Sequence, residues 1–125
     1  MGVRRVLLDT NILIDYLAGK ASARAEIERY AMPAISIVTW IEVMAGATLD
    51  DEQIRRNFLA TFLILPLTME IAERSSEIRR HRIPRLKLPD TIILATAQLD
   101  DLLLVTRNSK DFPSKERDIR IPYKL

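Results

Sequence analysis

The chain contains no cysteine, and His81 is the one histidine among its 125 residues. The lack of cysteine excludes disulfide bridges and thiol catalysis, and it is typical of proteins that fold in a reducing compartment. One histidine argues against histidine-rich zinc sites and against histidine-based catalytic triads. Any bound metal ion would therefore need oxygen ligands, which suits hard cations such as Mg²⁺ or Mn²⁺.

Long apolar runs are also absent. No stretch approaches the roughly 20 apolar residues needed to cross a bilayer, and the apolar run before Asp9 is too short for a signal peptide. We therefore expect a soluble, cytoplasmic protein without a membrane contact. The formal net charge of +2 is too small to indicate a nucleic-acid partner by its size alone.

What the sequence does contain is an alternation of short apolar runs and amphipathic stretches. The predicted strands are residues 6–8, 34–37, 63–65, 102–106 and 119–121. The predicted helices are residues 12–17, 22–30, 39–46, 52–62, 68–82 and 89–97. This alternation predicts one α/β domain over residues 1–125, in which helices cover both faces of a mostly parallel sheet.

Several acids fall where predicted strands end or where the next helix begins. Asp9 ends the first strand, Glu42 lies early in the third helix, and Asp90 opens the last helix. Asn108 and Asp111 follow the most apolar strand. Ligands of parallel sheets bind outside the carboxyl ends of the strands, and carboxylates gathered there repel one another unless a cation neutralises them. The pattern predicts a divalent metal site.

Each acid also has a purely structural explanation. Asp9 is a good turn residue, and the spacing from Thr39 to Glu42 matches a capping box. Asp90 suits the positive end of its helix dipole, and Asp111 suits a turn. The joint occurrence of these acids at one inferred edge of the sheet favours the functional interpretation.

Four blocks of the sequence resemble the PIN-domain ribonucleases, among them the VapC toxins of toxin–antitoxin pairs. The first block places Asp-Thr-Asn after an apolar strand, and the second carries an acid followed by small residues. The blocks follow the order and spacing of that family over nearly the whole chain, at residues 6–14, 37–46, 87–97 and 104–112. The resemblance implies a PIN-like three-layer α/β/α domain.

The resemblance also implies a metal-dependent endoribonuclease whose Asp9, Glu42 and Asp90 bind Mg²⁺ or Mn²⁺. Many PIN domains have a further acid where this chain has Asn108. Either Asp111 supplies that catalytic carboxylate, or Asn108 acts through its amide oxygen. The residues expected to orient the acids or a bound water molecule are Thr10, Asn11, Thr106 and Asn108.

Basic residues lie close to these motifs in the sequence. Cations beside an acidic pocket can hold the RNA phosphates on either side of the cut, although cations also suit a solvated helix end. The candidates for phosphate binding are Arg79, Arg80, Arg82, Arg85, Lys87, Arg107 and Lys110.

The family likeness further implies a cognate VapB-like antitoxin and a homodimer, with the apolar helix faces at 12–17 and 54–62 as candidate contact surfaces. Two alternatives stay open: a stand-alone RNA-processing PIN nuclease and a non-catalytic nucleic-acid-binding PIN module. A receiver domain would need an acidic pair after the first strand, and a dehalogenase-like phosphatase would need Asp-x-Asp. Asn11 stands where the second aspartate would be.

Overall fold

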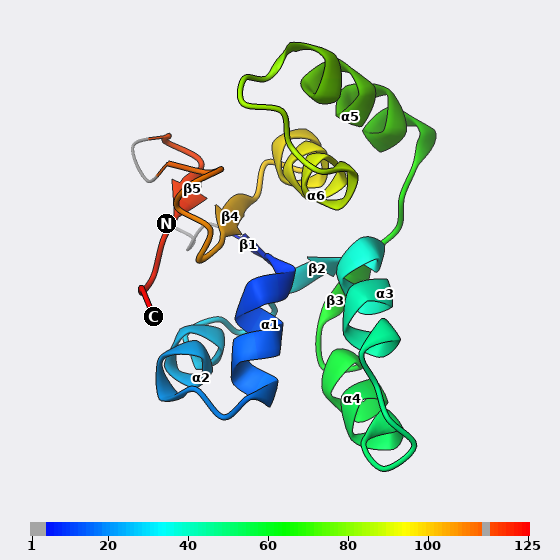
Figure 1. Ribbon diagram of the computed structural model, residues 1–125, viewed down its shortest axis with the longest axis vertical. Helices are drawn as coiled ribbons and strands as arrows, with labels where there is room; N and C mark the ends of the chain where they lie inside the picture. Colours follow the sequence, from blue (N-terminus) through cyan, green and yellow to red (C-terminus); the bar gives the residue numbers. More distant parts are fainter. Residues whose placement is uncertain (1–4, 114–115) are drawn as a thin grey trace.

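The computed structural model describes residues 5–113 and 116–125. Within them, five parallel strands form one sheet in the order β3-β2-β1-β4-β5 (Figure 1). The strands are β1 Val6–Leu8, β2 Ala34–Ser36, β3 Leu63–Leu65, β4 Leu103–Val105 and β5 Ile119–Arg120. The helices are α1 Thr10–Leu17, α2 Ala21–Glu28, α3 Ile37–Ala45, α4 Glu52–Leu59, α5 Met69–His81 and α6 Leu88–Leu99.

The central strand β1 shows why the sheet is covered on both faces. Its three residues are all buried, and alternate side chains of a strand point to opposite faces. Leu7 packs in the core beneath α5 and α6, whereas Val6 and Leu8 pack in the core beneath α1, α3 and α4. Figure 1 shows these two groups of helices on opposite sides of the sheet. The expected three-layer α/β/α architecture is confirmed.

The strand order reverses beside β1. The chain passes from β1 to β2 and β3 on one side and then returns to β4 on the other side of β1. The two strand ends meet there, since the backbone N–H of Asp9 donates to the carbonyl oxygen of Val105 at 2.8 Å. Such a switch point in a parallel sheet opens a crevice at the carboxyl ends of the strands.

Several predicted boundaries differ from the structure by a few residues, and the difference at the start of α3 matters for the site. Helix α3 begins at Ile37, directly after β2, because the Ser36 hydroxyl accepts a hydrogen bond from the Val38 N–H at 3.0 Å and caps the helix. Thr39 therefore lies inside the helix rather than at its cap, and Thr39 with Glu42 forms no capping box. Both side chains are available for contacts elsewhere.

No helix in the described parts of the chain is both long enough and apolar enough to cross a membrane.

We expect Leu8→Ala to lower the free energy of unfolding by about 2–5 kcal/mol, because it leaves a cavity in a well-packed core. Leu8 is 0% exposed in the central strand, whereas Leu49 is 97% exposed, so Leu49→Ala is the control. Urea unfolding of both variants checks the expectation. Equal losses in the two would contradict the assignment of β1 to the core.

Candidate active site

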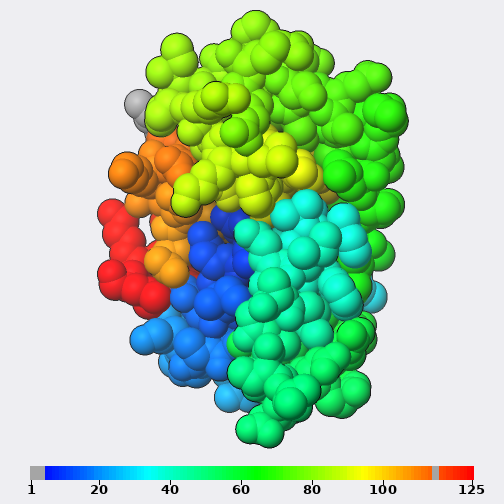
Figure 2. All heavy atoms as spheres, turned by 45° about the vertical axis from the view of Figure 1, so that its right-hand side comes forward, coloured from blue at the N-terminus to red at the C-terminus, as the bar shows by residue number. Residues whose placement is uncertain are grey.

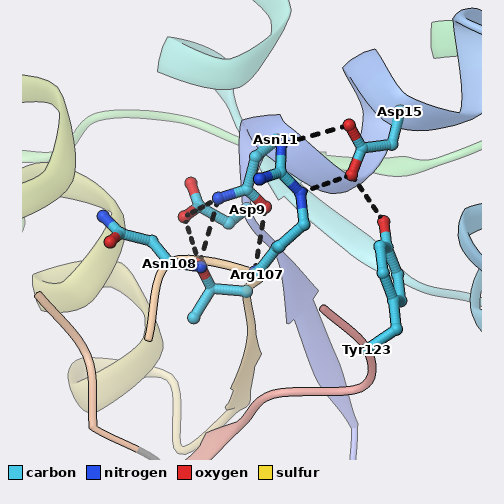
Figure 3. Close-up of polar contacts among 7 residues, drawn as sticks. Asp9, Asn11, Asp15, Arg107, Asn108 and Tyr123 are labelled. Carbon is cyan, nitrogen blue, oxygen red and sulfur yellow. Dashed lines mark hydrogen bonds and ion pairs between the residues drawn. The ribbon is translucent and has the colours of Figure 1, made fainter. Parts of the chain in front are cut away.

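The carboxylate of Asp9 lies at the junction of β1 and β4 and is almost fully buried, at 4% exposure. Three donors hold it, and Figure 3 shows the Asn11 side chain beside it. The Thr10 N–H donates to Oδ1 at 2.8 Å, the Thr106 hydroxyl donates to Oδ2 at 2.7 Å, and the Asn11 amide approaches Oδ2 at 3.3 Å. These bonds fix the direction in which Asp9 points.

The Thr106 hydroxyl connects the groups around Asp9. While it donates to Asp9, its oxygen accepts hydrogen bonds from the Asn11 amide at 3.2 Å and from the Asn108 N–H at 3.0 Å. The Asn11 amide oxygen in turn accepts the N–H of Arg107 at 3.1 Å. The sequence pattern Thr-Arg-Asn after β4 therefore forms one hydrogen-bonded unit with the start of α1.

Glu42 is joined to this unit from α3. The Thr10 hydroxyl donates to Glu42 Oε1 at 2.7 Å, and its oxygen lies 2.9 Å from that of Thr39. Since the Thr10 proton is directed to the carboxylate, the fully buried Thr39 hydroxyl donates to Thr10. Thr39, which the sequence pattern predicts to cap the helix, makes this contact from inside α3 instead. A threonine three residues before the acid, on the same helix face, was the available signal.

The acids affect one another electrostatically. The pKa of Asp9 is raised from 3.8 to about 6, chiefly by burial and also by the negative charges of Asp90 and Glu42, against the lowering effect of the hydrogen bonds from Thr106 and Thr10. Burial also raises the pKa of Asp90, as do the charges of Glu42 and Asp111. The structure thus brings Asp9, Glu42, Asp90 and Asp111 to one edge of the sheet from four separate segments.

The surface is hollowed where these segments meet. Figure 2 shows the start of α1, in dark blue, recessed between α3 in cyan, α6 in yellow and the orange segment after β4. Among the described residues, however, no three acids, histidines or cysteines are arranged closely enough to enclose a metal ion. The donor set contains only oxygen ligands and carries unbalanced negative charge, so it fits a hard divalent cation without forming a closed cage.

Asn108 and Asp111 are paired in a turn. The Asn108 amide donates to Asp111 Oδ2 at 3.0 Å, and its oxygen accepts the Asp111 N–H at 3.2 Å. The amide oxygen of Asn108 is therefore already engaged, whereas the charge of Asp111 reaches Asp90.

The predicted phosphate-binding residues occupy different settings. Four of them line a groove of about 580 Å³ at the end of α5, together with His81 and Ile83. The groove residues among the candidates are Arg79, Arg80, Arg82 and Arg85. The positive charge of Lys87 lowers the pKa of Asp90, which places this lysine near the acids. Lys110 is exposed.

Two of the candidates have partners inside the protein. Arg82 donates to the carboxylate of Glu116 at 2.7 Å and to the carbonyl oxygen of Asp111 at 3.1 Å. Arg107 donates twice to the buried carboxylate of Asp15, at 2.6 and 3.2 Å. This placement argues against the phosphate-binding role expected for Arg107, because its guanidinium neutralises an internal charge.

The model of the PIN domain family matches residues 6–117 of the chain. This chain belongs to the PIN domain family. It is 34% identical to ribonuclease VapC10 of Mycobacterium tuberculosis over 118 residues, which cover 90% of this chain and 89% of that protein. It is 32% identical to ribonuclease VapC1 of Methanocaldococcus jannaschii, over 86% of this chain and 79% of that protein.

The solved structures agree with this assignment to the PIN family. A chain of a toxin–antitoxin complex from Klebsiella pneumoniae superposes with a TM-score of 0.88 and is 47% identical, with 96% of this chain and 99% of that chain covered. A chain of FitAcB from Neisseria gonorrhoeae, at 22% identity and a TM-score of 0.79, shares the fold.

In the metal-free PIN domain, we expect Asp9→Asn to raise the free energy of unfolding at pH 7.5 by about 1 kcal/mol. A folded-state pKa of about 6 means that ionised Asp9 costs stability, by about 3 kcal/mol at most from the pKa difference. The lost acceptor for Thr106 reduces this gain.

The direction in which stability changes with pH follows from the protons that Asp9 binds in the folded and unfolded states. Between about pH 4 and pH 6 the folded state retains a proton on Asp9 that the unfolded state has lost, so stability falls as the pH rises. The advantage of Asp9→Asn should therefore disappear near pH 4. Urea unfolding in EDTA at both pH values measures it, with the exposed Asp50→Asn as control. A lower stability of Asp9→Asn at pH 7.5 would contradict the assignment.

Proposed function

We propose that this PIN domain is a metal-dependent endoribonuclease that hydrolyses RNA phosphodiester bonds and acts as the toxin of a toxin–antitoxin pair. The observation that carries the proposal is the gathering of four acids at the switch point of a parallel sheet, with the innermost acid held by three donors. The ribonucleases to which the chain is similar support the same substrate class. We assign this activity to residues 1–125 as one domain.

Asp9, Glu42 and Asp90 are the residues that would hold Mg²⁺ or Mn²⁺. For the further catalytic carboxylate we favour Asp111 over Asn108, because Asp111 is an acid whose charge reaches Asp90, whereas the Asn108 amide is neutral. When bound, a divalent cation neutralises phosphate charge and acidifies water for the attack on phosphorus. No side chain of the site needs to form a covalent intermediate.

The polar residues of the chain prepare this site. Thr106 and Asn11 donate hydrogen bonds to one oxygen of Asp9. The hydroxyl of Thr10, the first residue of α1, donates to Glu42. Such bonds keep carboxylates in place before the substrate arrives, so less reorganisation is needed during the reaction.

The basic groove at the end of α5 is the proposed path for the RNA backbone. Arg79, Arg80, Arg85 and Lys87 present cations along a segment that leads to Asp90, and the exposed Lys110 lies in the turn next to Asp111. Contacts to phosphates fix the position of a nucleic acid without reading its sequence.

The proposed partner is a small VapB-like antitoxin. Of the surfaces expected from the sequence, Ile12 and Leu13 are buried in the core, whereas Ile54 is 63% exposed. An apolar groove of about 540 Å³ lies between α3 and α4, with Trp40 and Leu49 in its lining. We favour this groove over the face of α1 for the antitoxin. Homodimer formation and a cytoplasmic location remain parts of the proposal.

A stand-alone RNA-processing nuclease would use the same acids. The similarity of this chain to a chain of the toxin–antitoxin complex from Klebsiella pneumoniae favours the toxin. A non-catalytic binding module is disfavoured, because such a module has no need for several mutually repelling carboxylates at one edge.

We expect Asp90→Asn to lower the rate of RNA cleavage at least about 100-fold, because it removes a charge from the proposed cation site. Cleavage of several RNAs with Mg²⁺ or Mn²⁺, and again with EDTA, measures the effect. Millimolar metal should also raise the melting temperature of the wild-type chain, since the ion binds the folded state.

Asp100→Asn is the matched control, because Asp100 is exposed at the opposite end of α6. Full activity in a well-folded Asp90→Asn protein would overturn the proposed site. Cleavage that is unaffected by EDTA would overturn the metal dependence alone.

We expect Arg85→Ala and Lys87→Ala each to weaken RNA binding and to flatten the dependence of log K on log salt by about 0.7 per lost phosphate contact. Binding is measured at several salt concentrations with an Asp90→Asn background that does not cleave. Lys20→Ala, at the far end of α1, should leave the slope unchanged. Unchanged slopes in all three variants would place the RNA elsewhere.

A further inference from the structure

A second buried carboxylate lies close to the site. Asp15, on α1, is 5% exposed. It accepts two hydrogen bonds from the guanidinium of Arg107 and a third from the hydroxyl of Tyr123 at 2.8 Å. We call these three residues the Asp15 network (Figure 3). Burial and then the bond to Asp15 raise the pKa of Tyr123, so the phenol stays protonated and acts as a donor.

The Asp15 network and the active site share one stretch of backbone. Arg107 directly follows Thr106, whose hydroxyl holds Asp9. The N–H of Arg107 donates to the amide oxygen of Asn11, while its guanidinium binds Asp15. The main chain at the end of β4 is therefore attached to α1 at two points beyond Asp9 itself.

The spacing of residues on α1 explains how Arg107 can contact both Asn11 and Asp15. Asn11 and Asp15 are four residues apart and so lie on the same face of the helix. Arg107 bridges them, with its backbone on Asn11 and its side chain on Asp15. Rotation of α1 relative to β4 would break both contacts and would also turn Asp9, which caps the same helix.

We propose that Asp15, Arg107 and Tyr123 are positioning residues for the nuclease reaction, because they fix α1 against the end of β4 and thereby fix the direction of the Asp9 carboxylate. The inference rests on the proposed function of the same site. It assigns to Arg107 an internal role in place of a contact with RNA.

The chain carries a matched network that serves as a control. Glu26, 4% exposed on α2, accepts two hydrogen bonds from Arg120 at 2.8 and 3.0 Å and one from Tyr30 at 2.5 Å. The backbone carbonyl oxygen of Arg120 accepts the N–H of Thr106 at 3.0 Å, but among the described residues none of the side-chain hydrogen bonds of Glu26 or Tyr30 reaches Asp9 or the groups that hold it. A tyrosine-to-phenylalanine change therefore removes an equivalent bond in each network.

The experiment compares Tyr123→Phe with Tyr30→Phe. Amide hydrogen exchange is followed by NMR in EDTA at Arg107, whose N–H binds Asn11, and at Thr10, whose N–H binds Asp9. Melting temperatures, kcat and KM are measured on the same samples with Mg²⁺ or Mn²⁺. The exchange readout does not depend on RNA cleavage.

We expect both variants to melt at similarly lowered temperatures. Only Tyr123→Phe should speed exchange at Arg107 and Thr10, by about threefold to tenfold, and only it should lower kcat by a similar factor with KM unchanged. Arg107→Lys, which retains a positive charge beside Asp15, should keep more activity than Arg107→Gln.

Equal exchange rates and equal kcat values in the two phenylalanine variants would overturn the inference and leave Asp15 with a purely structural role. A rise in KM alone with Arg107→Lys would return Arg107 to substrate binding. If the wild-type chain cleaves no RNA, the proposed function fails, while the exchange comparison still decides whether the Asp15 network holds the Asp9 region.

Discussion

The Asp9 carboxylate is 4% exposed, so the groups around it must supply the hydrogen bonds that water would otherwise provide. Asp9 keeps its place because three donors meet it at the point where β1 and β4 end. Even so, its pKa lies about two units above the usual value, since burial and neighbouring acids outweigh those hydrogen bonds. The fold tolerates this cost at Asp9, and negative charge held there attracts a cation.

The parallel sheet explains why this happens at that edge. Every strand of the described sheet runs in the same direction, so all the carboxyl ends meet on one side. The reversal of strand order beside β1 leaves room there for acids carried by α3 and α6 beside the start of α1. Side chains that are far apart in sequence thus become neighbours through backbone topology, and a chain that is only 22% identical shares the fold.

Much of this could be predicted from the chain alone. Apolar runs that end in Asp9 and Thr106 mark buried strands, and the likeness of four blocks to PIN domains identified the family correctly. The cap of α3 could not be predicted, because Ser36 and Thr39 are both good capping residues and only the position of β2 decides between them. The partner of Arg107 was missed for a related reason. From the sequence, a basic residue beside a motif suggests phosphate binding, and only the fold shows that the Arg107 guanidinium donates to Asp15.

The direct passage from β2 into α3 has a consequence for how this domain can change over time. Ser36 ends the strand and Ile37 begins the helix, with no connecting residue between them. Glu42 is therefore placed by counting helical residues from the sheet, and one inserted residue would swing it by about 100° around the helix axis. Loops elsewhere in the chain can lengthen, but this junction must keep its length for the acid to stay in register with Asp9.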